Sequence, residues 1–302
     1  MSRPLPTGQL PGPSYYDLQG ADAGAPWRIF VHVPAGDPPP HGWPLLVTTD
    51  GNAMIDTAIA AAEVQASYPK GTNVEPGVIA SIGYPTEGRY DPLRRSFDLS
   101  PPPGRQYPPF VDGGPIVRTG GADRFHAFIE DGLLPFLDTI APLDRNRRTL
   151  FGHSFGGLFA LHVLFAGSDA FRAYVAASPT IYWEDGNLLE RENAYLAAGT
   201  PPRTITVRLS AGAYEDLALA PFQERQANRE ERLANLQLAR TAGLARDMAL
   251  RLAAAGMDAE FESHAAETHM TVLPVAISRA VGVAFARRPE PTLGQGSEQN
   301  GA

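Results

Sequence analysis

The residues best suited to chemistry lie in the stretch LFGHSFGGLFAL, which contains Gly152, Ser154 and Gly156. A Gly-x-Ser-x-Gly sequence is the pattern of a serine nucleophile on a sharp turn between a strand and a helix. Residues 147–153 predict a strand and residues 156–166 predict a helix, so Ser154 falls on the turn between them. We interpret Ser154 as a nucleophile, and the alternative is a serine that caps the following helix.

A serine nucleophile needs a base that takes its proton, and His269 is the histidine best placed for that role. It lies in AAETHMTVLP, between the last predicted strand, 258–265, and the last predicted helix, 271–286. That loop leaves the same edge of the sheet as the turn that carries the serine. The alternative for His269 is a surface or capping histidine.

The acid that orients the base is expected between the serine and the histidine in chain order. LSAGAYEDLAL ends the strand predicted at 203–212 and offers Glu215 and Asp216. We favour Glu215, with Asp216 as the close alternative and helix capping as the ordinary role of either. An oxyanion hole needs two backbone N–H groups, and the candidates are Phe155 and Asn52, or a neighbour of Asn52 in the turn TTDGNAM.

The elements that must position these residues follow a regular alternation. Short apolar runs predict strands at 27–34, 44–50, 77–85, 147–153, 171–179, 203–212 and 258–265. Helical patterns fall at 52–67, 122–140, 156–166, 222–255 and 271–286. This order predicts an α/β protein with a mostly parallel, doubly wound sheet and helices on both faces. We expect one domain over residues 1–302, with a core at about 15–288 and flexible tails at 1–14 and 289–302.

Two segments are longer than a connector needs to be. Residues 85–120 are rich in Pro and Gly, and residues 179–201 contain Tyr182 and Trp183. Both leave the carboxyl ends of strands, the edge at which open α/β sheets bind ligands. The first segment carries Arg89, Arg94, Arg95, Arg105 and Arg118. This basic cluster suits an anionic substrate, and the alternative is a solvated loop.

The composition excludes several classes of function. A net charge of −8 argues against a nucleic-acid partner, and the absence of an 18-residue apolar run argues against a membrane span. No cysteine is present, and no phosphate-loop or zinc-helix motif occurs, so we expect no cofactor and no metal site. No secretory signal begins the chain, which predicts a cytoplasmic protein, or a periplasmic one if a leader has been removed. The sequence leaves the oligomeric state open.

Several ordered stretches of the chain resemble the esterase D type α/β-hydrolases, which include the enterochelin (ferric siderophore) esterases. They are LLVTTDGNAM, RYDPLRRSFDLSPP, GGADRFHAFIEDGLLPFL, GHSFGGLFALHVLF, FRAYVAASPTIYW and THMTVLP, and together they span residues 44 to about 286. The resemblance implies the α/β-hydrolase fold and hydrolysis of carboxylic esters. It also implies a bacterial enzyme of iron acquisition, whose small-molecule substrate is an anionic ferric siderophore or a related ester.

The resemblance assigns residues as well. Ser154 and His269 match the family's nucleophile and base, and Glu215 lies where its acid usually lies. Arg95 matches the arginine that faces the anionic ligand in siderophore esterases. The other residues that we expect to contact substrate are Arg94, Trp183, Tyr182 and His153.

The substrate is left open by departures from the family pattern, such as Ser100 for Thr and Tyr182 for Trp. We therefore predict a serine hydrolase with a Ser-His-Glu triad that cleaves siderophore ester or lactone bonds and so releases iron. The alternatives are a carboxylesterase or thioesterase for another acyl or carbohydrate ester, and a non-catalytic ligand-binding relative.

Overall fold

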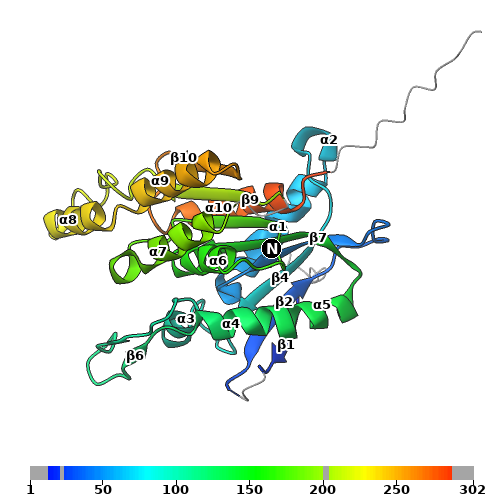
Figure 1. The fold of residues 1–302 in the computed structure, drawn as a ribbon, viewed down its shortest axis with the longest axis horizontal. Coiled ribbons are helices and arrows are strands. Elements are labelled where there is room, and N and C mark those ends of the chain that lie inside the picture. The colour runs from blue at the N-terminus through cyan, green and yellow to red at the C-terminus, as the bar shows by residue number, and fades with distance from the viewer. Residues whose placement is uncertain (1–12, 21–23, 200–203, 288–302) are drawn as a thin grey trace, which may run out of the picture.

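A central sheet of eight strands organises the computed structural model, which describes residues 13–20, 24–199 and 204–287 (Figure 1). The strand order is β1-β2-β4-β3-β7-β8-β9-β10. The bounds are β1 (Ser14–Leu18), β2 (Trp27–His32), β3 (Trp43–Thr48), β4 (Val78–Gly83), β7 (Leu143–His153), β8 (Ala173–Ala177), β9 (Thr206–Gly212) and β10 (Asp258–His264). The six strands from β4 to β10 in this order run parallel to one another, whereas β2 runs antiparallel to both of its neighbours, β1 and β4. The expected mostly parallel sheet is confirmed.

The inner strands are buried on both faces, which explains their nearly continuous apolar sequences. Successive residues point to opposite sides of the sheet: Leu45 and Val47 of β3 join one core, and Leu46 joins the other. Every residue of β3, β4 and β8 is buried. A sheet held between two apolar layers is a rigid support for the loops at its edge.

Helices cover both faces of this sheet (Figure 1). One face lies under α1 (Gly51–Ala66) and α10 (Val272–Ala284), which bury Met54 and Ile277 against it. The helices on the opposite side are α4 (Ala122–Phe128), α5 (Leu134–Ile140), α6 (Phe155–Phe165), α7 (Trp183–Ala197) and α9 (Thr241–Ala254). The α6 helix is buried almost all round, so its sequence shows no polar face.

Two helices predicted as continuous are interrupted. The segment 122–140 contains a π-helical turn, η1 (Ile129–Leu133), between α4 and α5. The segment 222–255 forms α8 (Arg229–Ala239) and α9, which are separated by Arg240 at φ 48°. The α9 helix packs on β9 and β10, whereas α8 buries no residue. The spacing of leucines predicts helix in both parts, but it does not show that only one part has a sheet face to cover.

The long segment 85–120 contains elements that the sequence analysis missed. The helix α3 (Pro92–Asp98) begins after Asp91, whose carboxylate accepts a hydrogen bond from Arg94 N at 3.0 Å. A hairpin follows, made of β5 (Gln106–Tyr107) and β6 (Val117–Arg118). The strand β1 and the short helix α2 (Pro69–Thr72) were also missed. The tails expected at the chain ends fall mostly at residues 1–12 and 288–302, outside the described residues.

A buried ion pair fastens α7 to α9, and its loss should destabilise the protein. Glu192 is 1% exposed and accepts hydrogen bonds from Arg251 Nε at 2.9 Å and Nη2 at 2.7 Å. In Arg251→Met the carboxylate stays buried without its partner. We expect the free energy of unfolding to fall by about 2–3 kcal/mol, less than for a fully buried pair because water screens the half-exposed arginine.

Urea unfolding followed by circular dichroism measures this change. The control is Arg279→Met, which breaks the exposed pair between Arg279 and Glu262 and should cost less than about 1 kcal/mol. Equal losses in the two variants would contradict a special contribution from the buried pair.

Candidate active site

The turn that carries Ser154 is a strained connection between β7 and α6. Ser154 has φ 57° and ψ −117°, an unusual conformation for a residue with a Cβ. Its N–H donates to Ala177 O at 2.9 Å. A Cβ on Gly152 would lie 1.9 Å from Gly156 O, and a Cβ on Gly156 would lie 2.2 Å from Thr49 Oγ1. The two glycines are therefore required by close packing, and the turn holds the serine hydroxyl at the carboxyl edge of the sheet.

The structure joins Ser154, His269 and Glu215 in one line of hydrogen bonds. His269 Nε2 lies 2.9 Å from Ser154 Oγ, and His269 Nδ1 lies 2.7 Å from Glu215 Oε2. Because a carboxylate only accepts hydrogen bonds, Nδ1 carries the proton and the Nε2 lone pair faces the hydroxyl. The arrangement can thus withdraw the serine proton, as nucleophilic attack requires.

The acid of this line is Glu215, and Asp216 has another role. The Glu215 side chain is almost completely buried, and its Oε1 accepts hydrogen bonds from Gly212 N and Ser178 Oγ, both at 2.6 Å. Asp216 instead accepts a hydrogen bond from Ala242 N at 2.8 Å, in the first turn of α9. Ser178 was missed by the sequence analysis, because a serine after a strand gives no sign that it will face a carboxylate across the sheet edge.

His153 lies behind the site rather than in contact with open space. Its side chain is buried, and its Nε2 lies 2.7 Å from His269 O. Burial, with the neighbouring His269 as the second cause, lowers the pKa of His153 to about 3. The neutral imidazole therefore donates Nε2–H to this carbonyl. The sequence analysis expected a substrate contact, whereas the observed contact of the ring is with the backbone of His269.

The loop after β3 is held in place from two sides. The Asn52 side chain accepts from Tyr84 N at 2.8 Å and donates to Tyr84 O at 3.0 Å and Thr86 O at 3.1 Å. These bonds commit the Asn52 amide group to the loop after β4. Only the backbone N–H of Asn52 is then suited to an oxyanion hole, together with that of Phe155 in the first turn of α6.

Asp50, two residues before Asn52, forms a buried ion pair. Arg95 Nε donates to Asp50 Oδ1 at 2.8 Å and Arg95 Nη2 donates to Oδ2 at 2.9 Å. Burial lowers the pKa of Arg95, but the Asp50 carboxylate outweighs that effect and the net shift is upward. Asp50 has φ 53° and immediately precedes α1. The pair thus fixes the backbone that presents the Asn52 N–H, and it neutralises much of the Arg95 charge.

The remaining expected contacts separate into two groups. Arg94 donates to Pro26 O at 2.6 Å and to Ala25 O at 3.0 Å, so its guanidinium binds the backbone just before β2. A substrate contact by Arg94 stays a prediction, and it would have to use the N–H groups that these two bonds leave free. Trp183 packs edge-on against Phe155, with ring centroids 4.7 Å apart. Tyr182 is only partly covered, at 44% exposed, and this partial removal from water, with the charge of Glu215 second, raises its pKa.

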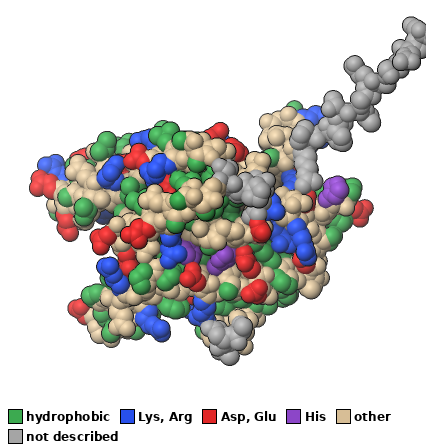
Figure 2. Space-filling model, viewed as in Figure 1, with side chains coloured by type: hydrophobic (Ala, Val, Ile, Leu, Met, Phe, Trp, Pro, Cys, Tyr) green, Lys and Arg blue, Asp and Glu red, His purple; other side chains and the backbone are tan. Residues whose placement is uncertain are grey.

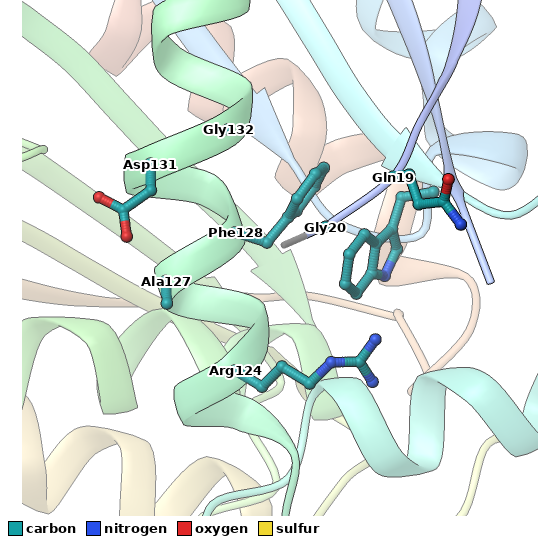
Figure 3. A pocket seen from close by; sticks show the side chains of 8 residues that line it. Gln19, Gly20, Arg124, Ala127, Phe128, Asp131 and Gly132 are labelled. Atoms are coloured by element: carbon teal, nitrogen blue, oxygen red, sulfur yellow. The ribbon is translucent and has the colours of Figure 1, made fainter. Parts of the chain in front are cut away.

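A separate cavity of about 340 Å³ lies between the end of β1 and the α4–η1 segment (Figure 3). Its walls include the rings of Trp27 and Phe128 and the side chains of Arg124 and Asp131. Among the described residues that line it there is no serine or histidine, so it offers no nucleophile with a base. The hydrogen-bonded line of Ser154, His269 and Glu215 lies elsewhere, in the segments that follow β7, β10 and β9.

Within residues 13–20, 24–199 and 204–287, no helix combines the length and the apolar character that a bilayer crossing requires. In this part of the chain no three metal-ligating side chains come together. The face shown in Figure 2 carries acidic and basic side chains side by side.

Comparison with known proteins finds relatives along most of the chain. A family model described as "Putative esterase" matches residues 21–248. The ferri-bacillibactin esterase BesA of Bacillus subtilis is 32% identical over 289 residues, which cover 95% of this chain and 94% of the relative. A siderophore enterobactin esterase of Emericella nidulans is 33% identical and covers 77% of this chain and 82% of its own.

A solved structure gives the same result. The siderophore hydrolase EstA from Aspergillus nidulans superposes with a TM-score of 0.79 at 29% identity, over 93% of this chain and 96% of that one.

The low pKa of His153 predicts a specific loss of stability in acid. Its folded-state pKa is about 3 and its ordinary value is 6.5. Between these values the unfolded chain binds more protons at this residue than the folded protein, so the free energy of unfolding falls as the pH falls. By about pH 5 the His153 contribution amounts to a loss of about 2 kcal/mol.

Urea unfolding near pH 7 and near pH 5, with the wild type and His153→Gln, tests this. The variant keeps an N–H donor but does not titrate, so its stability should fall by about 2 kcal/mol less over this interval. His162, whose pKa is lowered to about 4, is present in both proteins and cancels. Equal decreases in the two proteins would contradict a neutral His153.

Proposed function

Because this chain belongs to the esterase family and has the α/β-hydrolase fold, we propose that it is a serine hydrolase that cleaves the ester bonds of siderophores. The observation that carries the proposal is the continuous contact from Glu215 through His269 to Ser154, at 2.7 Å and 2.9 Å. The relatives that cover 95% and 77% of this chain support the substrate class, because their names specify ferri-bacillibactin and enterobactin.

The proposed reaction proceeds through an acyl-enzyme. Ser154 Oγ attacks the ester carbonyl carbon while His269 Nε2 takes the hydroxyl proton. The N–H groups of Phe155 and Asn52 bind the oxygen that becomes negatively charged. The tetrahedral intermediate then collapses, and His269 donates the proton to the leaving alcohol.

Water completes the turnover. His269 takes a proton from a water molecule that attacks the acyl carbon, the carboxylic acid leaves, and the proton returns to Ser154 Oγ. One water is consumed for each ester cleaved. The iron of a ferric siderophore is part of the substrate, and hydrolysis of a linking ester lowers the effective concentration of the chelating groups at the metal.

The charges around the site are compatible with an anionic substrate. Arg95 is neutralised by Asp50. Arg89 and Arg105 also lie near acids, Asp56 at 3.6 Å and Glu184 at 3.3 Å, but their side chains are more exposed than that of Arg95. Arg89 Nη1 also donates to Asn52 O at 3.1 Å, which places this cation beside the loop proposed to bind the oxyanion. Exposed arginines at the rim of a site accelerate the approach of an anion.

The proposed triad predicts graded losses of activity. Ser154→Ala should lower kcat by a factor on the order of 10⁴–10⁶, since the nucleophile is lost. Glu215→Gln should lower kcat by a factor on the order of 10³–10⁴. The Glu215 carboxylate accepts hydrogen bonds on both oxygens, from Gly212 N and Ser178 Oγ on one and from His269 Nδ1 on the other. A glutamine replaces one of these oxygens with an NH₂ donor, so the bonds on that side are lost.

Steady-state kinetics on a p-nitrophenyl ester measures these losses, and circular dichroism checks that the variants are folded. The matched control is Asp216→Asn, an adjacent acid that caps α9, for which kcat should stay within about threefold. A fluorophosphonate should label Ser154 in the wild type. An unlabelled serine, or a fully active Ser154→Ala, would rule out the proposed nucleophile.

The substrate class is tested by product analysis. We expect the wild type to convert a catecholate trilactone siderophore, with or without Fe³⁺, into linear products that have gained one water per ester, as mass spectrometry detects. We expect kcat/KM on the trilactone to exceed that on p-nitrophenyl acetate by at least about tenfold, because remote contacts contribute to transition-state binding. Turnover of the aryl ester alone would contradict the siderophore assignment and leave a general esterase.

A further inference from the structure

Glu184 is a buried carboxylate that the proposed reaction does not use. It follows Trp183 directly, and its side chain is 2% exposed. Its Oε1 accepts a hydrogen bond from Tyr107 Oη at 3.1 Å, and its Oε2 lies 3.3 Å from Arg105 Nε. Both partners belong to the segment that enters the β5–β6 hairpin. A charged group removed from water needs such partners, so the hairpin and the start of α7 depend on each other.

The backbone at Glu184, which makes this contact, and at the next two residues has positive φ. Glu184 has φ 47° and ψ 58°, Asp185 has φ 58° and ψ 24°, and Gly186 has φ 83° and ψ 29°. Three successive residues in left-handed conformations are unusual, and only the glycine adopts one without cost. Such a conformation persists only where the surroundings hold it. The contacts of the Glu184 side chain with the hairpin supply part of this restraint.

Aromatic rings connect this contact to the proposed nucleophile. The ring of Tyr107 lies 5.3 Å from that of Trp183, and Trp183 lies 4.7 Å from Phe155, centroid to centroid. Phe155 follows Ser154 and contributes one of the N–H groups proposed for the oxyanion hole. The hairpin is therefore two ring contacts away from the reacting groups.

A second attachment acts on the same segment. Pro102 O accepts hydrogen bonds from Asn187 Nδ2 at 3.1 Å and from Arg191 Nη2 at 3.0 Å. These bonds hold the base of the segment on α7. The rest of the hairpin, beyond Arg105, is then held at α7 by Glu184 and the Trp183 ring.

The hairpin projects from the body of the molecule (Figure 1). In Figure 1 it extends on the same side as α8, with α7 between them, and Figure 2 shows a notch in the outline between these two projections. The turn of the hairpin exposes three apolar side chains, Phe110, Val111 and Ile116. An exposed apolar tip beside a site, with the half-exposed Arg105 near its base, suits a large substrate that carries rings and negative charge.

We propose that Glu184 is a positioning residue: it fastens the β5–β6 hairpin against Trp183, and the fastened hairpin selects large siderophore esters over small esters. The inference rests on the proposed function for its substrate and on the hairpin contacts for its mechanism. A small ester reaches Ser154 without touching the hairpin. A siderophore extends beyond the ring contacts and needs the hairpin in place.

The test compares Glu184→Gln with Asp185→Asn. Both substitutions remove one negative charge, and the two residues are neighbours in the same left-handed segment. For Glu184→Gln we expect KM for the catecholate trilactone to rise about tenfold with kcat within about twofold, while kcat/KM for p-nitrophenyl acetate changes less than about twofold. Asp185→Asn should match the wild type on both substrates. Tyr107→Phe, which keeps the ring and loses the hydroxyl, should shift KM in the same direction by a smaller factor.

Limited trypsin digestion provides a readout that needs no siderophore. Cleavage after Arg105 and Arg118 should be about tenfold faster in Glu184→Gln than in Asp185→Asn, because an unfastened hairpin opens more often. A wild type inactive on siderophores, with this proteolytic difference present, would refute the substrate but retain the fastening. Unchanged cleavage rates, an unchanged trilactone KM, or an equal loss on both esters would overturn the role of Glu184.

Discussion

The Glu215 carboxylate is removed from water and is held by three hydrogen bonds from three parts of the chain. Its partners are Gly212 N at the end of β9, Ser178 Oγ after β8 and His269 Nδ1 after β10. A buried charge without these donors would be prohibitively costly, so the loops must converge on it for the protein to fold. The position of the imidazole, and with it the contact to Ser154, follows from this requirement.

A second buried acid organises the other side of the site. Asp50 lies at the N-terminus of α1, where a negative charge interacts favourably with the helix dipole, and Arg95 closes over it. The guanidinium is also near the rings of Tyr90 and Phe155, at 5.4 Å and 5.7 Å from their centroids. Arg95 therefore links the loop after β3 to the turn after β7. Arg95 thereby holds in register two segments that carry the N–H groups proposed for the oxyanion hole.

The parts of the site predicted from sequence are those with a local pattern. The elbow at Ser154 needs only a strand, two glycines and a helix, and His269 and Glu215 each follow a recognisable strand. The contacts of Arg94 and the burial of His153 arise from packing of segments that lie far apart in the chain. Sequence types alone could not distinguish a substrate-binding cation from one that donates to Pro26 O. The break at Arg240 could not be predicted either, because α8 and α9 have the same helical periodicity. They differ only in that α9 packs on the sheet and α8 does not.

Backbone strain gathers at the edge that carries the site. Among the described residues, eight that are not glycine have positive φ, and six of these eight lie in the segments that follow β3, β7, β8 or β10. These six are Asp50, Ser154, Ser178, Glu184, Asp185 and Ala266. Each such conformation costs free energy and persists only where neighbours prevent relaxation.

The restraint comes from strands that are buried on both faces and from the acid contacts described above. Loosening one strand end would release several strained residues together, because Ser154 N is bonded to Ala177 O and Ser178 N to Ser210 O. The site is therefore stabilised as a unit with the sheet edge, and the residues that set its geometry include many that never approach the ester.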